Sequence, residues 1–338
     1  MSQDTLLIQV LKAVLGADLA IQLGLVAAVV IFIPIGLYVA FRVKRRWAYE
    51  EKRGALEAEQ DHAGVKGVEK AVSPALVVCV ASFEVPATAN GCEKSLSFVE
   101  LFDGRFIKSA DSWDRDIWPR LRSFFADLRQ LSRPLRLRLD AHSTIAFACG
   151  ALVDVKSGIA LEVEQKGERG IEVWTPTTSR ELRTLPGLLS SPESLGNDGP
   201  DIAVALSITR SVTADVRTYV TNYQPMVGSI VAIMPEGGPG QGRVIDGDHA
   251  ACLADAVAAE INDMRGGMGA KGRIHLFASA PNSLMVALGR RSLSFGALQL
   301  YEFDFQRAKT STYMPSLELG GSAARESEQT EPSLVTSP

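Results

Sequence analysis

The feature that most constrains this chain is an uninterrupted apolar segment near its N-terminus. Residues 19–41 read LAIQLGLVAAVVIFIPIGLYVAF and include no charged side chain. A helix of this length, rising about 1.5 Å per residue, is just long enough to cross a hydrocarbon core about 30 Å thick. We therefore predict that residues 1–41 form a membrane segment, with a transmembrane helix at about 19–41.

The charges on either side of the apolar segment predict its orientation. The cationic run RVKRRW (42–47) follows it, whereas the N-terminal side carries Asp4, Lys12 and Asp18. Because cationic residues accumulate on the cytoplasmic side, the larger C-terminal part is expected in the cytoplasm. A cleaved signal peptide fits less well, since its charges precede a shorter apolar region. Whether the short apolar stretch 6–15 adds a second membrane-inserted segment stays open.

Polar segments flank the rest of the chain. Residues 42–72 are rich in Lys, Glu, Arg, Gln and Ala, which is typical of a charged juxtamembrane linker. Residues 320–338 lack apolar periodicity and are predicted to be a disordered tail. The formal net charge of -4 argues against a DNA or RNA polymer as partner, because binding many phosphates needs a concentrated basic surface.

Between these segments, apolar runs alternate with helical patterns in two groups. Runs typical of buried strands cover residues 75–81, 135–139, 159–163, 201–208, 229–234, 273–278 and 297–303. Helical periodicity covers residues 113–131, 143–152, 213–219, 248–264 and 282–289. The loop-rich stretch 175–200 separates the groups. We predict an α/β fold of parallel character, with a first half at 73–180 and a second at 200–305.

The two halves resemble each other. RLRLDAHSTIAFACG (136–150) and RIHLFASAPNSLMVALG (273–289) each read as strand, small or polar turn, helix and glycine. ALEVE (160–164) likewise matches the start of ALQLYE (297–302), so the similarity extends through the next strand. Chance likeness between two βαβ units is the alternative, but an internal duplication is the preferred interpretation.

The sequence offers no recognisable catalytic or metal-binding constellation. The Gly-rich segment EGGPGQGR (236–243) lacks the Gly-Lys-Ser/Thr ending of a P-loop, so a surface loop is preferred. In DGDHAAC (246–252), acidic residues fit a helix N-cap better than a metal site. No HExxH motif, Cys-His cluster or GxSxG elbow is present. We predict that the protein is not an enzyme and holds no metal or cofactor.

Four widely spaced cysteines lie in mostly apolar contexts. They are Cys79, Cys92, Cys149 and Cys252. Because none forms a Cys-x-x-Cys pair and the domain is expected in the cytosol, reduced packing residues are preferred to disulfides.

Small and polar residues gather where predicted strands end, which is where open α/β sheets usually bind ligands. Four such junctions supply Ser82, Phe83, Asp140, His142, Ser143, Thr144, Ser207, Thr209, Arg210, Ser211, Ser279, Ala280, Pro281 and Asn282. Helix N-terminal N–H groups attract phosphate, and Arg210 adds a cationic fork, so a phosphate-bearing ligand suits them. Ordinary turns with Ser and Asn as helix caps are the alternative.

The run IHLFASAPNSLMVALGRRSLSFGALQLYEFD (274–304), preceded by DIAVALSITRSVTADVRTYV (201–220), resembles the SAVED domain of bacterial antiphage signalling systems. The likeness spans about residues 73–304, and the second half carries its more specific part. It implies two fused CARF-like halves of Rossmann-like topology that bind a cyclic oligonucleotide, here expected to be a cyclic trinucleotide, made by a CD-NTase enzyme.

With the apolar segment, the resemblance implies a transmembrane effector of a CBASS-type system, single-pass in the bacterial inner membrane. Ligand binding would drive homo-oligomerisation, cluster the helices in the lipid bilayer and disrupt the membrane in abortive infection. Arg210 is the first choice for a phosphate contact. His142 could bond a base or phosphate, although a buried or capping histidine at a turn is preferred. Phe83 or Trp113 could stack on a base, although core packing is preferred for both. A membrane-anchored scaffold and a nucleotide-processing enzyme are the alternatives.

Overall fold

The computed structural model of the chain describes residues 74–83, 91–167, 170–175, 187–267, 272–304 and 313–320. The predicted transmembrane helix (19–41) and linker (42–72) lie outside them, as does the predicted tail beyond Gly320. Within the described ranges, no helix combines the length and apolar character needed to span a bilayer. All described residues belong to one unit, which begins at Ser73.

The first sheet has the strand order β2-β1-β5-β6-β7, and only the β6–β7 pair is antiparallel. Its strands are β1 (Leu76–Ala81), β2 (Lys94–Ser97), β5 (Leu135–Asp140), β6 (Leu161–Gly167) and β7 (Gly170–Trp174). The alternation LRLRLD in β5 sends Leu135 and Leu137 into the core. Arg136, between them, faces away from this core and pairs with Glu162 at 2.6 Å.

The second sheet has the order β13-β12-β11-β9-β10-β8, with a parallel centre and an antiparallel strand at each edge. Its strands are β8 (Leu188–Ser194), β9 (Asp201–Ser207), β10 (Val227–Pro235), β11 (Ile274–Ser279), β12 (Leu298–Phe303) and β13 (Tyr313–Leu319). The continuous apolar run of β9 fits a strand buried on both faces.

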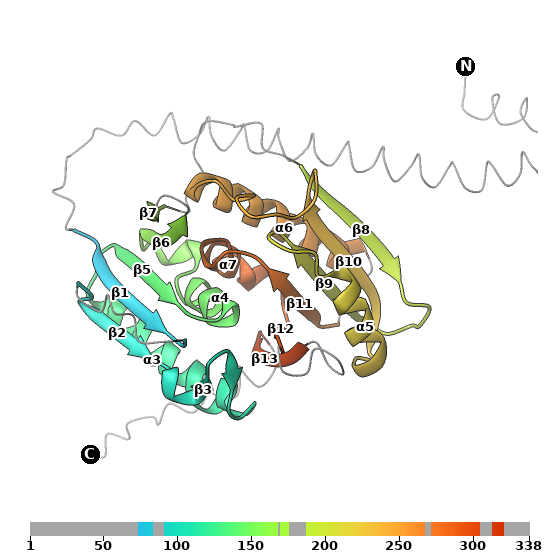
Figure 1. Cartoon of the computed structure of the whole chain (residues 1–338), viewed down its shortest axis with the longest axis horizontal. Coiled ribbons are helices and arrows are strands. Elements are labelled where there is room, and N and C mark those ends of the chain that lie inside the picture. The colour runs from blue at the N-terminus through green and yellow to red at the C-terminus, as the bar shows by residue number, and fades with distance from the viewer. Residues whose placement is uncertain are drawn as a thin grey trace, which may run out of the picture. The chain divides into compact units, whose positions relative to one another are not determined.

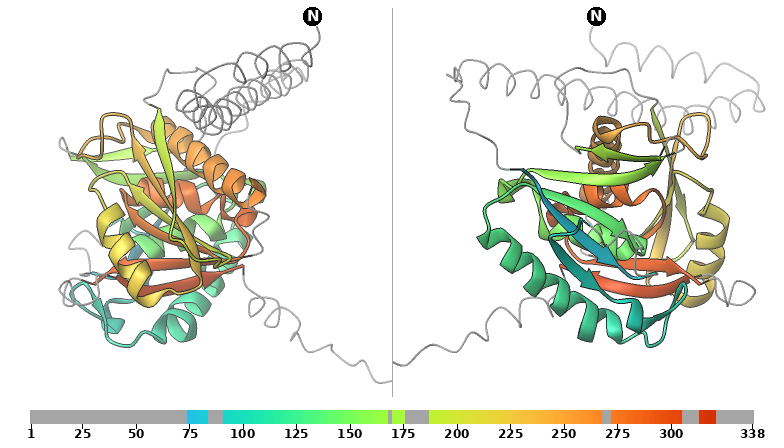
Figure 2. Two further views of the ribbon diagram at one scale, coloured as in Figure 1. Left: turned by 90° about the vertical axis from the view of Figure 1, so that its right-hand side faces the viewer. Right: turned by 60° about the vertical axis from the view of Figure 1, so that its left-hand side comes forward.

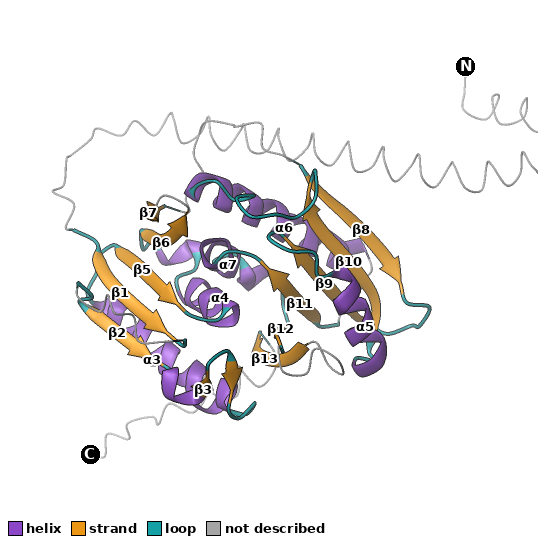
Figure 3. Cartoon of the chain, viewed as in Figure 1, coloured by secondary structure: helices purple, strands orange, loops and turns teal. Residues whose placement is uncertain are grey.

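The main helices pack against the faces of the two sheets. They are α3 (Trp118–Gln130), α4 (Ser143–Leu152), α5 (Thr213–Tyr223), α6 (Gly247–Gly267) and α7 (Asn282–Gly289). One core joins α3, α4, α6 and α7 to both sheets, and α4 and α7 lie between the sheets (Figures 1 and 3). Helix α5 covers the other face of the second sheet through a separate apolar cluster. Figure 2 shows this layering from two other sides.

The topology repeats. In each half, the first strand pairs with a strand that comes later in the chain. A helix then leads to a third, parallel strand, and an antiparallel strand completes the unit. These elements are β1, β5, α4, β6 and β7 in the first half, and β9, β11, α7, β12 and β13 in the second. The repeat units meet through α4 and α7, which pack with their backbones touching. A Cβ built on Gly150 would overlap the backbone of Val286, and one on Gly289 would overlap the backbone of Phe147. The two glycines hold equivalent positions in the repeat.

Every predicted helix and strand is present within a few residues of its expected bounds. Two strands were not predicted: β8, within the loop-rich stretch 175–200, and β13, which extends the second sheet beyond residue 305. Both are edge strands that contain a proline, Pro192 and Pro315. Edge strands tolerate proline because one side of their backbone makes no ladder bonds, so the strand signal in the sequence is weak.

The interpretation of all four cysteines as reduced was wrong for one pair. Cys79 in β1 and Cys92 just before β2 form a disulfide, with Cα atoms 5.9 Å apart. Sequence spacing does not reveal it, because the parallel pairing of β1 with β2 brings the two residues together. Cys149 is buried in α4, where burial raises the pKa of its thiol.

Candidate functional site

The four predicted junctions meet in two equivalent pairs. After β1, the N–H groups of Ser82 and Phe83 donate to the carbonyl of Asp140 at 3.0 and 3.3 Å. After β9, the N–H groups of Ile208 and Thr209 donate to the carbonyl of Ser279 at 3.0 and 2.9 Å. Each pair joins the carboxyl ends of two neighbouring parallel strands, as the topology of an open sheet requires.

In the first half, hydrogen bonds and aromatic contacts fix the position of the His142 side chain. Its Nε2 lies 3.1 Å from the carbonyl oxygen of Arg105, which only accepts, so Nε2 carries the proton. Its Nδ1 then accepts from the Ser82 hydroxyl at 2.7 Å, and that hydroxyl accepts from the His142 N–H at 2.9 Å. The imidazole lies between the rings of Phe83 and Phe102, each with its centroid 4.3 Å away.

This first-half end is covered by an insertion between β2 and α3. It contains η1 (Val99–Leu101), the hairpin of β3 (Phe102–Asp103) with β4 (Phe106–Ile107), and the π-helix η2 (Trp113–Ile117). His142 is buried beneath it, and Trp113, the first residue of η2, is buried as well. The burial of His142 fits the preferred interpretation of a buried histidine at a turn, and that of Trp113 fits core packing, while Phe83 is only half-buried.

In the second half, the junction is more accessible. The hydroxyls of Thr209 and Ser279 lie 2.8 Å apart, and Arg210 and Ser211 are exposed. The Arg210 guanidinium stacks over the ring of Phe303, 4.6 Å from its centroid. Ser207 is an exception, because it is buried and its hydroxyl accepts from the Val212 N–H at 3.0 Å.

The Gly-rich segment 236–243 lies against this junction. The N–H of Gly240 donates to the carbonyl of Ile208 at 3.0 Å, and Arg243 donates to the carbonyl of Gly237 at 2.7 Å. The segment connects β10 to α6, the same place in the repeat that the β3–β4 insertion occupies between β2 and α3. Each half therefore carries an insertion over the carboxyl ends of its strands.

Across the two halves, the start of α4 and the start of α7 exchange polar contacts. Asn282 donates to the carbonyl of Ala141 at 2.9 Å. Glu302 of β12 accepts from the N–H of Thr144 at 2.7 Å and from the Ser143 hydroxyl at 3.0 Å. These contacts join the four junctions into one polar region along the line between the halves. Sequence reasoning missed Glu302, although it ends the repeated segment ALQLYE.

The predicted capping role of Asp246 is confirmed. Its carboxylate accepts from the N–H of His249 at 2.8 Å, at the start of α6. Of the residues that the structure describes, no three His, Cys, Asp or Glu side chains are grouped to hold a metal ion.

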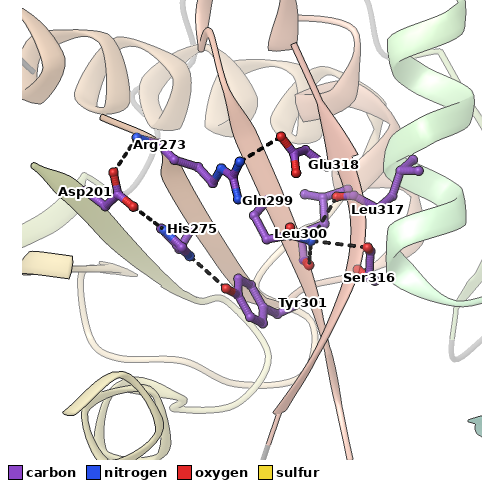
Figure 4. Close-up of polar contacts among 9 residues, drawn as sticks. All are labelled: Asp201, Arg273, His275, Gln299, Leu300, Tyr301, Ser316, Leu317 and Glu318. Carbon is purple, nitrogen blue, oxygen red and sulfur yellow. Dashed lines mark hydrogen bonds and ion pairs between the residues drawn. The ribbon is translucent and has the colours of Figure 1, made fainter. Parts of the chain in front are cut away.

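A separate buried network lies at the opposite, amino ends of the second-sheet strands (Figure 4). Asp201 accepts from the N–H of Arg273 at 2.8 Å and from Nε2 of His275 at 3.1 Å. Because the carboxylate only accepts, His275 carries its proton on Nε2, and Nδ1 accepts from the Tyr301 hydroxyl at 2.7 Å. Arg273 also pairs with Glu318 of β13 at 2.8 Å.

Both buried histidines predict a pH-dependent stability. Burial lowers the pKa of His142 and His275 below the ordinary value of 6.5. Below about pH 6.5, these histidines bind protons in the unfolded chain but stay neutral in the folded chain. The free energy of unfolding therefore decreases by up to about 1.4 kcal/mol per pH unit for each histidine, until the pH reaches the lowered pKa of the folded state. Urea unfolding between pH 7.5 and 5.5 measures this slope. A flat profile would contradict it, and His275→Gln should reduce the slope.

The described residues match a known domain family. Residues 117–319, more than half of the chain, match SAVED, the SMODS-associated and fused to various effectors sensor domain. The chain is a member of the SAVED family. It is also 35% identical over 227 residues to CD-NTase-associated protein 4 of Enterobacter hormaechei subsp. hoffmannii (strain UCI 50). That match covers 67% of this SAVED chain and 44% of the relative.

Solved structures show the same fold. The Acinetobacter baumannii Cap4 SAVED/CARF-domain containing receptor with the cyclic trinucleotide 2'3'3'-cAAA has a TM-score of 0.56 at 13% identity, covering 73% of this chain and 51% of that chain. The same receptor with 3'3'3'-cAAA has a TM-score of 0.55 at 14% identity, covering 73% and 52%. The SAVED chain described here thus spans about half the length of the relatives that it matches. The expected pair of fused CARF-like halves agrees with this fold and with the observed repeat.

Proposed function

We propose that this SAVED chain is a sensor that binds a cyclic oligonucleotide, expected to be a cyclic trinucleotide, across its two halves. The observation that carries the proposal is the convergence of the Thr209–Arg210 junction with the Ser279–Asn282 junction at an accessible end of the second sheet. A ligand with several phosphates needs cationic and hydroxyl donors at this place, and both are present there. The fold shared with a receptor that was solved with cyclic trinucleotides supports the choice of ligand.

The first half contributes less to this proposed contact surface. Ser82, His142 and Thr144 are buried, and their polar groups bond within the protein. Phe83, Asp140 and Ser143 remain partly accessible, so they are the first-half residues that the proposal retains for ligand contact. The ligand would therefore contact the second half more extensively.

The proposal extends to the whole chain as a membrane-anchored effector of a CBASS-type antiphage system. Residues 19–41 would cross the inner membrane once and leave the SAVED domain in the cytoplasm. The chain would act without catalysis. Ligand binding would drive homo-oligomerisation only if the ligand binds the assembled form more tightly than the free form, because equal affinity shifts no equilibrium. Assembly would then cluster the transmembrane helices and disrupt the membrane.

The test is calorimetric titration of the detergent-solubilised full chain with cyclic di-, tri- and tetranucleotides, with light scattering to follow the mass. We expect one member to bind and to increase the mass. Arg210→Ala should weaken binding about 10- to 100-fold, since it removes a charge-assisted contact to phosphate. Arg122→Ala, which removes an exposed arginine of α3, is the matched control and should bind normally.

Each other outcome has a clear meaning. Absence of binding to every member by a folded chain would reject the sensor and favour a membrane-anchored scaffold. Turnover of a bound member would favour a nucleotide-processing enzyme. Binding without an increase in mass would retain the sensor and reject ligand-driven assembly.

A further inference from the structure

The two helices that meet between the halves begin side by side. The Asn282 side chain, in the first turn of α7, donates to the carbonyl of Ala141, just before α4. Each helix N-terminus carries unpaired N–H groups and a positive partial charge. Two such ends near each other favour a negative charge between them, so the identity of the side chains that cap them matters.

The caps come from the opposite half and differ in charge. The N–H of Thr144 in α4 donates to the carboxylate of Glu302 at 2.7 Å. The equivalent N–H in α7, that of Ser283, donates to the neutral amide oxygen of Gln165 in β6 at 3.4 Å. Gln165 and Glu302 hold equivalent positions, because the repeated segments ALEVE and ALQLY precede them. The repeat thus caps α4 with a charged side chain through a shorter hydrogen bond and α7 with a neutral side chain through a longer one.

The hydroxyls beside these caps show the same asymmetry. The Thr144 hydroxyl lies 2.8 Å from the Ser316 hydroxyl of β13. Ser283 is only 1% exposed, and its hydroxyl has no hydrogen-bond partner among the residues that the structure describes. The Thr144 hydroxyl at the start of α4 is therefore hydrogen-bonded, whereas the Ser283 hydroxyl at the start of α7 has no partner within the described part of the chain.

We propose that Glu302 is a specificity-determining residue, which excludes ligand phosphate from the start of α4 and confines it to the second-half end at α7, Thr209 and Arg210. This inference rests on the proposed function. A carboxylate already bonded to the α4 N-terminus occupies the donors that a phosphate would need, and it repels a second anion. The ligand then sits unequally on the two halves, although the fold is a repeat.

The repeat provides its own matched variants. Glu302→Gln keeps an acceptor oxygen for Thr144 but removes the charge, and Gln165→Glu places a carboxylate at the start of α7 instead. In the full chain, we expect Glu302→Gln to bind its cyclic trinucleotide about tenfold more tightly and Gln165→Glu about tenfold more weakly, at low salt. The double variant moves the carboxylate from one helix to the other, so the two effects should offset each other and it should bind more tightly than Gln165→Glu. Calorimetry with 2'3'3'-cAAA and 3'3'3'-cAAA as probes measures the three affinities.

The outcomes separate this inference from the proposed function. If wild type binds and both single variants stay within about twofold of it, the role of Glu302 is rejected and the sensor stands. If no form binds a cyclic trinucleotide, the sensor proposal loses its support, and inorganic phosphate decides the role of Glu302. Phosphate should then raise the melting temperature of Glu302→Gln more than that of wild type. An equal rise in both, or none in either, would overturn the inference.

Discussion

Replacing Gly150 or Gly289 by alanine should unfold much of the protein at temperatures where the wild type is stable. A Cβ on Gly150 would lie 2.9 Å from the carbonyl carbon of Val286, and one on Gly289 would lie 2.9 Å from that of Phe147. The opposing atoms are backbone, so relief requires α4 and α7 to move apart and opens the core between the sheets. We expect each variant to lose about 3 kcal/mol of unfolding free energy, as for severe overpacking.

The matched control is Gly266→Ala in α6. This glycine is exposed, its added Cβ meets no atom within 4 Å, and its φ is not positive. Alanine there should leave the stability unchanged or raise it by up to about 1 kcal/mol, because alanine favours helix. Thermal and urea unfolding followed by circular dichroism compares the three variants. If Gly150→Ala and Gly289→Ala were as stable as the wild type, the halves would not pack as described.

Asp201→Ala should be nearly as damaging, because it leaves two donors without an acceptor, one of them on a buried histidine. The N–H of Arg273 and Nε2 of His275 both donate to this carboxylate, and His275 is almost fully buried. Loss of both bonds should cost about 3 kcal/mol, since an unsatisfied buried group such as the His275 ring N–H costs about 1 to 3 kcal/mol and the Arg273 bond adds a smaller loss. Urea unfolding at pH 7.5 measures the loss.

Asp198→Ala is the control for this experiment, because Asp198 is an exposed aspartate in the loop before β9. Its replacement should change the stability by less than about 0.5 kcal/mol. Tyr301→Phe tests the other end of the network, because it removes only the hydroxyl that donates to His275 Nδ1. Its loss of stability should lie between those of Asp198→Ala and Asp201→Ala. Equal stabilities of Asp201→Ala and Asp198→Ala would contradict the network in Figure 4.

The repeat explains which parts of the site were predictable. The matched segments placed Gly150 and Gly289 at equivalent positions, and they placed the junctions at the carboxyl ends of strands. They did not show that α4 takes its cap from β12 and α7 from β6, because helix caps from the other half involve residues more than a hundred positions apart. The repeat does place Gln165 and Glu302 at equivalent positions, but only the packing of the two halves brings each of them to the helix of the other half.

The sequence by itself determined the elements whose signal is local. Strand and helix periodicity, the apolar segment 19–41, the internal repeat and the small residues at strand ends all follow from side-chain patterns within short windows. Only the tertiary structure decided the disulfide of Cys79 with Cys92, the edge strands β8 and β13, the burial of His142 and the asymmetric caps at Glu302 and Gln165. These features depend on pairing between distant segments. Their stability comes from contacts that no short window of sequence contains.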